Sequence, residues 1–178
     1  MPDPSKPAAQ PLEPPDIHHV RAALGWLELG NPAEAGDEIA RVSAANLNHP
    51  DVLEVRWAVC AEGGSWDAAE EVAEALVAVA PERSSGWVHR AYAVRRRRGG
   101  GLEQAERLLL AALDKFPKES VIPYNLACYA AQLGRLGEAW DWLLRAAGIE
   151  GRIEVIRDRG LIDTDLEPLW KKLRRWGK

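Results

Sequence analysis

Histidine is the first residue type to consider for chemistry, because the chain has four of them and imidazole serves both as a base and as a metal ligand. His18 and His19 are adjacent, so on a helix they point in different directions. His49 and His89 stand alone, and no cluster of carboxylates or cysteines accompanies them. Because metal ligands must converge on one ion, we expect no metal site.

Other catalytic arrangements are also missing from the sequence. Cys60 and Cys128 lack metal-ligand spacing, and we expect both to be reduced core thiols. Adjacent carboxylates such as Glu70 and Glu71 are expected to be solvated charges on an exposed helix face. The sequence has neither a glycine-rich phosphate loop after a strand nor a Gly-x-Ser-x-Gly nucleophile motif. We therefore predict no catalytic residue and no cofactor, which means that the chain is not expected to be an enzyme.

A run of four arginines, Arg95, Arg96, Arg97 and Arg98, is the strongest local charge feature. Four consecutive side chains cannot share one helix face, because neighbours are about 100° apart. The run could contact phosphates or an acidic protein surface. It could equally be a solvated helix end, where positive charge is favoured. Gly99, Gly100 and Gly101 follow directly, so we expect a mobile loop there.

Composition places the chain among folded, weakly acidic proteins. Hydrophobic residues make up 47% of 178 residues, and the formal net charge is −4. No apolar stretch is long enough for a transmembrane helix, and the N-terminus lacks a signal-peptide pattern, so a cytoplasmic protein is expected. Six prolines within residues 1–15 predict a disordered N-terminal tail, followed by one domain over residues 16–178.

Glycine and alanine recur at fixed intervals and predict how this domain is built. The anchor alanines are 34, 36 and 34 residues apart, and a glycine precedes each of them by five residues: Gly30 and Ala35, Gly64 and Ala69, Gly100 and Ala105, Gly134 and Ala139. A period of this length predicts stacked helix hairpins. The repeats are expected at about 16–49, 50–83, 84–119 and 120–147.

The second helix of each hairpin is expected to bury one face. Apolar residues follow the anchor alanine by four and by seven positions in all four repeats: Ile39, Val42, Ala73, Leu76, Leu109, Ala112, Leu143 and Ala146. Positions with this spacing share one helix face. That face should pack against the neighbouring hairpin.

The C-terminal segment, residues 148–178, is predicted to close the stack. Residues 148–164 are expected to be an irregular connection. Residues 165–176 carry apolar side chains at helical spacing: Leu166, Leu169, Trp170, Leu173 and Trp176. Thr164 and Glu167 match a capping box. We expect a capping helix that is apolar on one face and basic on the other.

The repeats resemble the tetratricopeptide repeat. The match is carried by Tyr124-Asn125-Leu126-Ala127, Gly134, Glu138-Ala139 and Ala146 in repeat 4, by Trp87, Ala91, Ala105, Ala112 and Pro117 in repeat 3, and by Gly64, Ala69, Leu76 and Pro81 in repeat 2. The resemblance implies an all-α fold, a right-handed α-solenoid of four helix hairpins with a C-terminal cap. It also implies a protein-interaction module that acts as an adaptor, an assembly factor or a chaperone.

Two departures from the repeat pattern are notable. Trp57 occupies a position in repeat 2 where the pattern has a small residue. Repeat 3 has two extra residues at its turn, within Arg95 to Gly101. The hairpin junctions in the middle of the chain are therefore expected to depart from a regular array.

The resemblance also implies where a partner binds, because the first helix of each hairpin lines the concave groove. The matching positions are Asp51, Glu54, Ala58, Ala61, Ser85, Val88, His89, Tyr92, Arg95, Val121, Tyr124, Asn125, Cys128 and Gln132. Tyr92 and Tyr124 could anchor a peptide or a partner protein, and Asn125 could bind its backbone; both tyrosines could instead pack between helices. The lysines of a carboxylate clamp are missing, so binding of chaperone C-termini is not expected.

Two alternative functions stay open at this point. The run Arg95–Arg98 and the basic last helix could bind nucleic acid or an acidic partner, although the net negative charge argues against nucleic acid. Residues 166–178 could lie on a membrane surface instead of serving as a cap. Trp140 and Trp142 cannot face the same way on one helix. One of them should therefore be partly exposed, either at a second contact site or over residues 148–164.

Overall fold

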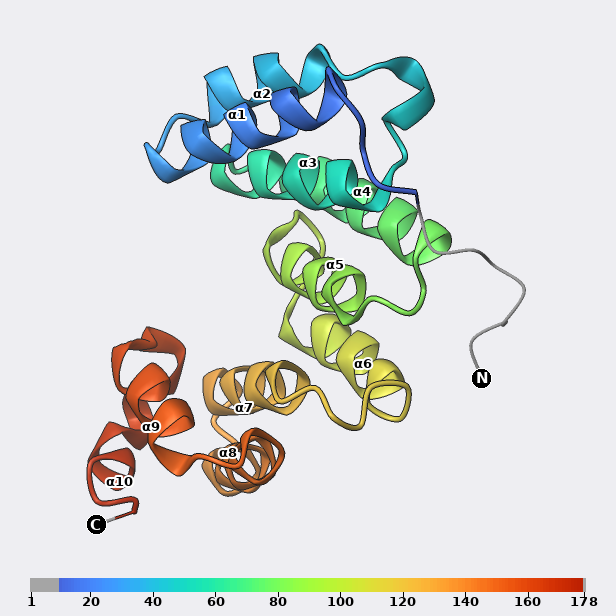
Figure 1. The fold of residues 1–178 in the computed structure, drawn as a ribbon. Coiled ribbons are helices and arrows are strands. Elements are labelled where there is room, and N and C mark those ends of the chain that lie inside the picture. The colour runs from blue at the N-terminus through green and yellow to red at the C-terminus, as the bar shows by residue number, and fades with distance from the viewer. Residues whose placement is uncertain (1–9, 178) are drawn as a thin grey trace. The chain divides into compact units, whose positions relative to one another are not determined.

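The computed structural model describes residues 10–177, and every regular element in that range is helical (Figure 1). The all-α fold expected from the sequence is confirmed. The chain divides into two compact units, Met1–Gly100 and Gly101–Lys178. This division falls within the glycine-rich turn predicted for repeat 3.

Unit 1 is built from two helix hairpins and one further helix. Its elements are α1 (Asp16–Glu28), α2 (Pro32–Ala40), a 3₁₀ helix η1 (Ala44–Asn46), α3 (Pro50–Glu62), α4 (Trp66–Val79) and α5 (Ser84–Arg96). Helix α1 pairs with α2, α3 pairs with α4, and α5 packs on α4 and α3. Asn31 starts α2 by accepting a hydrogen bond from the backbone N–H of Glu34. Gly64 turns the chain between α3 and α4 with a φ of 70°, which favours glycine.

The anchor alanines and the predicted second-helix faces form the core. Ala35, Ala69, Ala105 and Ala139 are fully buried. All eight residues expected on the buried faces are buried as well, two in each repeat, so this part of the sequence interpretation is confirmed. Small side chains at the anchor positions let paired helices approach closely.

The N-terminal part of unit 1 differs from the sequence interpretation in two places. Leu12 is buried in the core with Val20 and Val52, so residues 10–15 are not a disordered tail; residues 1–9 lie outside the described range. Helix α2 ends at Ala40, so Val42, which was expected on the same helix face as Ile39, lies after the end of the helix.

Asp16 explains how the chain continues after α2. Asp16 is the first residue of α1, and its carboxylate reaches another element. It accepts hydrogen bonds from the backbone N–H of Ser43 at 2.9 Å and from Nδ2 of Asn46 at 2.7 Å. These hydrogen bonds hold η1 against the start of α1, so the chain forms a separate turn after α2 has ended.

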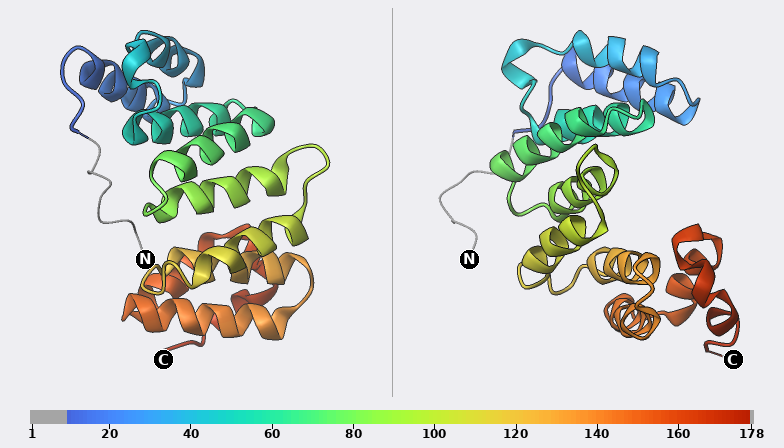
Figure 2. Two further views of the ribbon diagram at one scale, coloured as in Figure 1. Left: turned by 90° about the vertical axis from the view of Figure 1, so that its right-hand side faces the viewer. Right: turned by 180° about the vertical axis from the view of Figure 1, so that it is seen from behind.

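Unit 2 surrounds one central helix. Its elements are α6 (Leu102–Leu113), α7 (Val121–Gln132), α8 (Leu136–Glu150), α9 (Ile153–Ile162), a 3₁₀ helix η2 (Thr164–Leu169) and α10 (Trp170–Leu173). Helix α7 packs on α6, α8 and η2, and α9 packs on α8, η2 and α10 (Figures 1 and 2). Nine of the twelve residues of α7 are buried.

The C-terminal segment is more regular before residue 164, and less regular after it, than the sequence indicated. Gly151, with a φ of 76°, ends α8, and α9 forms within the predicted irregular connection. The predicted single capping helix is instead η2 followed by α10. The capping-box prediction for Thr164 is wrong, because the side chain of Asp163 accepts the hydrogen bond from the N–H of Asp165 at 3.0 Å.

Candidate functional site

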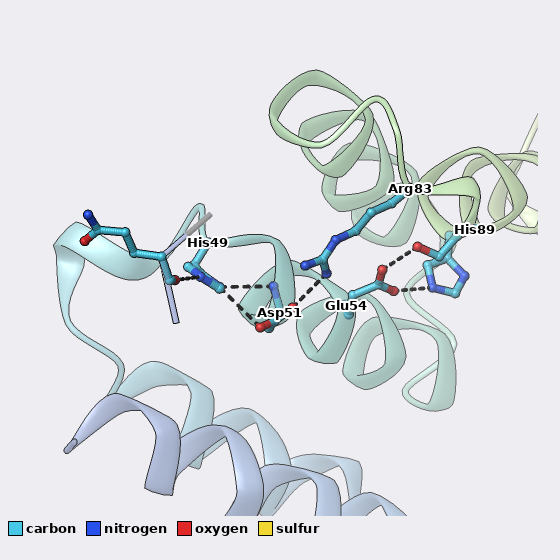
Figure 3. A network of polar contacts seen from close by, with 7 residues as sticks. His49, Asp51, Glu54, Arg83 and His89 are labelled. Carbon is cyan, nitrogen blue, oxygen red and sulfur yellow. Dashed lines mark hydrogen bonds and ion pairs between the residues drawn. The ribbon is translucent and has the colours of Figure 1, made fainter. Parts of the chain in front are cut away.

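A polar network joins α3 to α5 in unit 1 (Figure 3). Glu54 on α3 accepts a hydrogen bond from the Ser85 hydroxyl, and its Oε2 lies 2.8 Å from Nε2 of His89. Burial raises the pKa of Glu54, but the hydrogen bonds with His89 and Ser85 outweigh burial and bring that pKa below its ordinary value. Glu54 therefore carries a fixed negative charge near neutral pH.

A second branch of the network ties the start of α3 to its surroundings (Figure 3). Asp51 forms an ion pair of 2.7 Å with Arg83, which directly precedes α5. Nδ1 of His49 accepts from the N–H of Asp51 at 3.2 Å, so Nε2 carries the proton and donates to the carbonyl of Gln10 at 2.7 Å. These contacts fix the ends of α3 and α5 that lie beside Glu54.

Aromatic side chains continue this surface along both helices. Trp57 stacks on His89, with ring centroids 3.8 Å apart and an angle of 10° between the planes. Tyr92 meets Trp57 edge to face at 5.9 Å, and the ring centroid of Trp66 lies 5.9 Å from that of Tyr92. The guanidinium of Arg96 lies 3.6 Å from the Tyr92 ring centroid. Each of these side chains is partly exposed.

We call this surface the α3–α5 face. It comprises Glu54, Trp57, Ala58 and Ala61 of α3 with His89 and Tyr92 of α5. The two alanines follow Glu54 by four and seven positions, so they share its side of the helix, and both are partly exposed. His89 and Tyr92 were expected in the groove, and the structure brings them together with Glu54. Trp57 was missed as a site residue; its size at a small-residue position was the available signal.

Two of the predicted groove residues in unit 2, Tyr124 and Cys128, are buried by the chain itself, and exposed Gln132 is bonded to it. Tyr124 is only 1% exposed, and its hydroxyl donates to Asp163 at 3.0 Å. Cys128 is buried with its Sγ 3.5 Å from the same carboxylate, and Gln132 donates to the carbonyl of Asp165 at 3.0 Å. Burial raises the pKa of Tyr124, and the nearby Cys128 and Asp163 add to that shift. The expectation that Tyr124 is an exposed anchor is therefore corrected.

Asn125 and Arg95 are two other residues that were expected to contact a partner. Nδ2 of Asn125 donates to the carbonyl of Val121 in the preceding turn of α7 at 2.8 Å. Arg95 is partly exposed on the last turn of α5. Asn125 therefore has one fewer donor to offer a partner backbone.

Cys128, Asp163 and Asp165 bring potential metal-ligand atoms within 4.8 Å of one another. Both carboxylate oxygens of Asp163 already accept hydrogen bonds, one from the N–H of Asp165 and one from the donors on α7. The thiol of Cys128 is one of those donors. Hydrogen bonding that holds η2 against α7 accounts for this cluster.

The arginine run is partly used inside unit 1. Arg96 lies over Tyr92, and Arg97 forms an ion pair with Glu70 of α4. Arg98 lies in the turn that follows α5 and is exposed. The run is therefore not a continuous basic surface, because at least two of its four side chains have structural partners.

The described helices are all too short or too polar to cross a membrane. No protein-family model matches the sequence, and no curated protein is significantly similar to it.

Solved structures do match, and they define the class of fold. The thermophilic TPR protein TTC0263 of Thermus thermophilus is 22% identical, with a TM-score of 0.71 over 90% of this chain and 84% of its own. MamA AMB-1 is 18% identical, with a TM-score of 0.57 over 90% of this chain and 91% of its own. The predicted resemblance is confirmed for the fold: the chain has the helical-repeat fold of tetratricopeptide-repeat proteins.

Proposed function

We propose that this chain is a non-catalytic interaction module that binds a partner protein, through an extended segment of that partner, on the α3–α5 face. The observation that carries the proposal is the combination of Trp57 and Tyr92, both partly exposed, with the fixed charge of Glu54 on one surface. Aromatic anchors of this kind dominate the energetics of protein interfaces.

The side chains of this face are already held in place, which favours binding. Glu54 is fixed by Ser85 and His89, and His89 is fixed by stacking on Trp57. Ordering a free side chain at an interface costs about 0.5–1.5 kcal/mol, and here that cost is met on folding.

The surface also indicates the chemistry of the partner segment. Ala58 and Ala61 are small, partly exposed residues on α3, one and four positions after Trp57. An apolar partner side chain placed there would contact Trp57, and a neighbouring basic group or backbone N–H would face Glu54. Roles as an adaptor, an assembly factor or a chaperone all depend on such a segment.

Site-specific photo-crosslinking in the native cell tests this proposal. A photoreactive residue replaces Ala61 on the α3–α5 face or, as a matched control in the same unit, Ala40, which is exposed at the end of α2. We expect one discrete crosslinked partner from position 61 and none from position 40. Combining the probe with Trp57→Ala should weaken that product about tenfold or more, as for an interface hot spot. Equal products from both positions, or no effect of Trp57→Ala, would contradict the proposal.

A further inference from the structure

Only some of the apolar side chains expected on the buried face of the C-terminal cap are buried. Leu166, Leu169 and Leu173 point inward and are buried. The basic side chains beside them are exposed: Lys171, Lys172, Arg174 and Arg175. Residues 164–173 are therefore a packed cap. The side chains that this end of unit 2 offers to a ligand are the basic ones and Trp176.

Helix α8 presents an apolar stripe next to that exposed end. Leu136, Trp140 and Leu144 are four residues apart and share one side of the helix. Leu136 is 38% exposed and Leu144 is 45% exposed. Trp140 packs on Trp176 with ring centroids 5.0 Å apart, and Nζ of Lys172 lies 4.0 Å from the Trp140 ring centroid. Trp140 thus contacts the C-terminal tip.

Ile153, at the start of α9, extends the stripe. It is 40% exposed, and a methyl group added to Gly177 would lie 3.4 Å from its Cγ2, so the two residues are neighbours. We define the C-terminal patch as Leu136, Trp140, Leu144, Ile153 and Trp176. Its basic rim is Lys171, Lys172, Arg174 and Arg175.

We propose that the C-terminal patch binds the surface of an anionic lipid bilayer. Exposed leucine and isoleucine can enter the headgroup region, tryptophan favours that interface, and a basic rim is attracted to anionic headgroups. This inference is independent of the partner-binding proposal, because it concerns different residues in the other unit.

Charge distinguishes a bilayer from a second copy of the chain as the occupant. In a symmetric dimer through this patch the two basic rims would face each other, and like charges across an interface are unfavourable. The net charge of −4 does not oppose lipid binding strongly, because exposed charges farther away than about 8 Å are largely screened at physiological salt. Asp141 is the exposed acidic residue nearest the stripe along α8, one position after Trp140, while Glu138 faces away from the stripe and is paired with Arg135.

Vesicle co-sedimentation with the full chain tests the electrostatic part. The vesicles contain phosphatidylcholine alone or phosphatidylcholine with phosphatidylglycerol. We expect binding only to the second kind, and weaker binding as salt is raised. The triple variant Lys171→Gln, Arg174→Gln, Arg175→Gln should bind about a hundredfold more weakly, at about fivefold per basic side chain.

A matched control removes the same charge elsewhere: Arg21→Gln, Arg98→Gln and Arg107→Gln. This control should bind vesicles like the unchanged chain within about threefold. Circular dichroism melts of both triple variants establish that each is folded before binding is compared.

Two serine variants test whether the apolar residues of the C-terminal patch contribute to lipid binding. Leu144→Ser and Ile153→Ser should each weaken binding roughly three- to tenfold, because each removes about half of a buried aliphatic side chain. Ile162→Ser, which changes an exposed isoleucine outside the patch, should not. Failure to bind anionic vesicles at low salt overturns the proposal. The proposal is also overturned if the basic triple variant binds vesicles more weakly but Leu144→Ser and Ile153→Ser bind like the unchanged chain. That result is the behaviour of a site for a polyanion or an acidic protein.

Discussion

Single residues in unit 1 join elements that are distant in the sequence, and carboxylates do most of this. Asp16 and Glu54 each accept hydrogen bonds from residues about thirty positions away. Glu38 is hydrogen-bonded to His19, 19 positions away, and that hydrogen bond outweighs burial and lowers the pKa of Glu38. Each carboxylate stabilises the fold in its ionised form.

Asp16 makes this dependence testable. Hydrogen bonds from Ser43 and Asn46 lower the pKa of Asp16 in the folded chain. Its stabilising contribution is therefore present above the unfolded pKa of about 3.9 and is lost as the pH falls towards the lower folded value. We expect Asp16→Asn to lower the melting temperature by a few degrees at neutral pH. The variant should also lose less stability than the unchanged chain between pH 5 and pH 2.5.

Asp37→Asn is the control for that comparison, because Asp37 lies on α2 and takes no part in the Asp16 network. Its melting curves should follow those of the unchanged chain at every pH. If Asp16→Asn and Asp37→Asn behave alike in thermal melts, the hydrogen bonds of Asp16 do not carry the proposed stabilisation.

Residue-level prediction from the sequence succeeded where helix spacing alone decides a contact. His89 and Tyr92 share a helix face with the groove positions, and they do lie together. Trp57 was conspicuous by type, but its stacking on His89 depends on the distance between α3 and α5. Tyr124 could not be placed, because what covers it is a segment about forty residues later in the chain.

At the scale of elements, the hairpins were predictable because glycine and alanine mark the turns and the close helix contacts. Helix α9 was not. Its apolar residues are confined to its two ends and it contains Gly160, so its periodicity is weak. A methyl group on Gly160 would lie 3.1 Å from Leu173, which shows that α9 is stabilised by packing with α10. Tertiary packing of this kind leaves little trace in local sequence.

Two helical glycines give a matched prediction about elements. A Cβ at Gly25 in α1 would meet nothing within 4 Å, whereas one at Gly86 in α5 would lie 3.1 Å from Val77 and 3.3 Å from its backbone nitrogen. We expect Gly25→Ala to stabilise the chain by about 0.5–1 kcal/mol. We expect Gly86→Ala to destabilise it by about 1–3 kcal/mol. Urea denaturation of both variants measures the difference.

The test is whether Gly86→Ala has a lower free energy of unfolding than Gly25→Ala. If Gly86→Ala were as stable as Gly25→Ala, α5 would have room to move away from α4 at no cost. The contacts assigned to that helix pair would then be looser than described.

At the scale of the whole molecule, the chain consists of two units that meet in sequence at one glycine-rich turn. The sequence predicted one helix hairpin across that turn, with two extra residues in it. Whether both helices of a hairpin belong to one compact unit depends on the sum of many contacts. A repeat pattern does not report that sum.

Limited proteolysis tests this organisation. Arg98 lies in the turn and is exposed, while Arg97 is held by Glu70. We expect trypsin to cleave the described region first after Arg98, leaving two fragments that resist further digestion, since loop tips open at little free-energy cost. Mass spectrometry identifies the cleavage site. Early cleavage within α3 or α8 would contradict the division into two units.

The contact between η2 and α7 has a practical consequence for protein engineering. Asp163 and Asp165 hold η2 against α7, and α9 packs on α8, so both helices of the last hairpin are already covered by the chain that follows them. A designer who wants a longer array should therefore replace the segment after Gly151, not fuse a repeat behind it. New repeats can also be inserted before α7. The last hairpin and the cap then stay together and keep their contacts with each other.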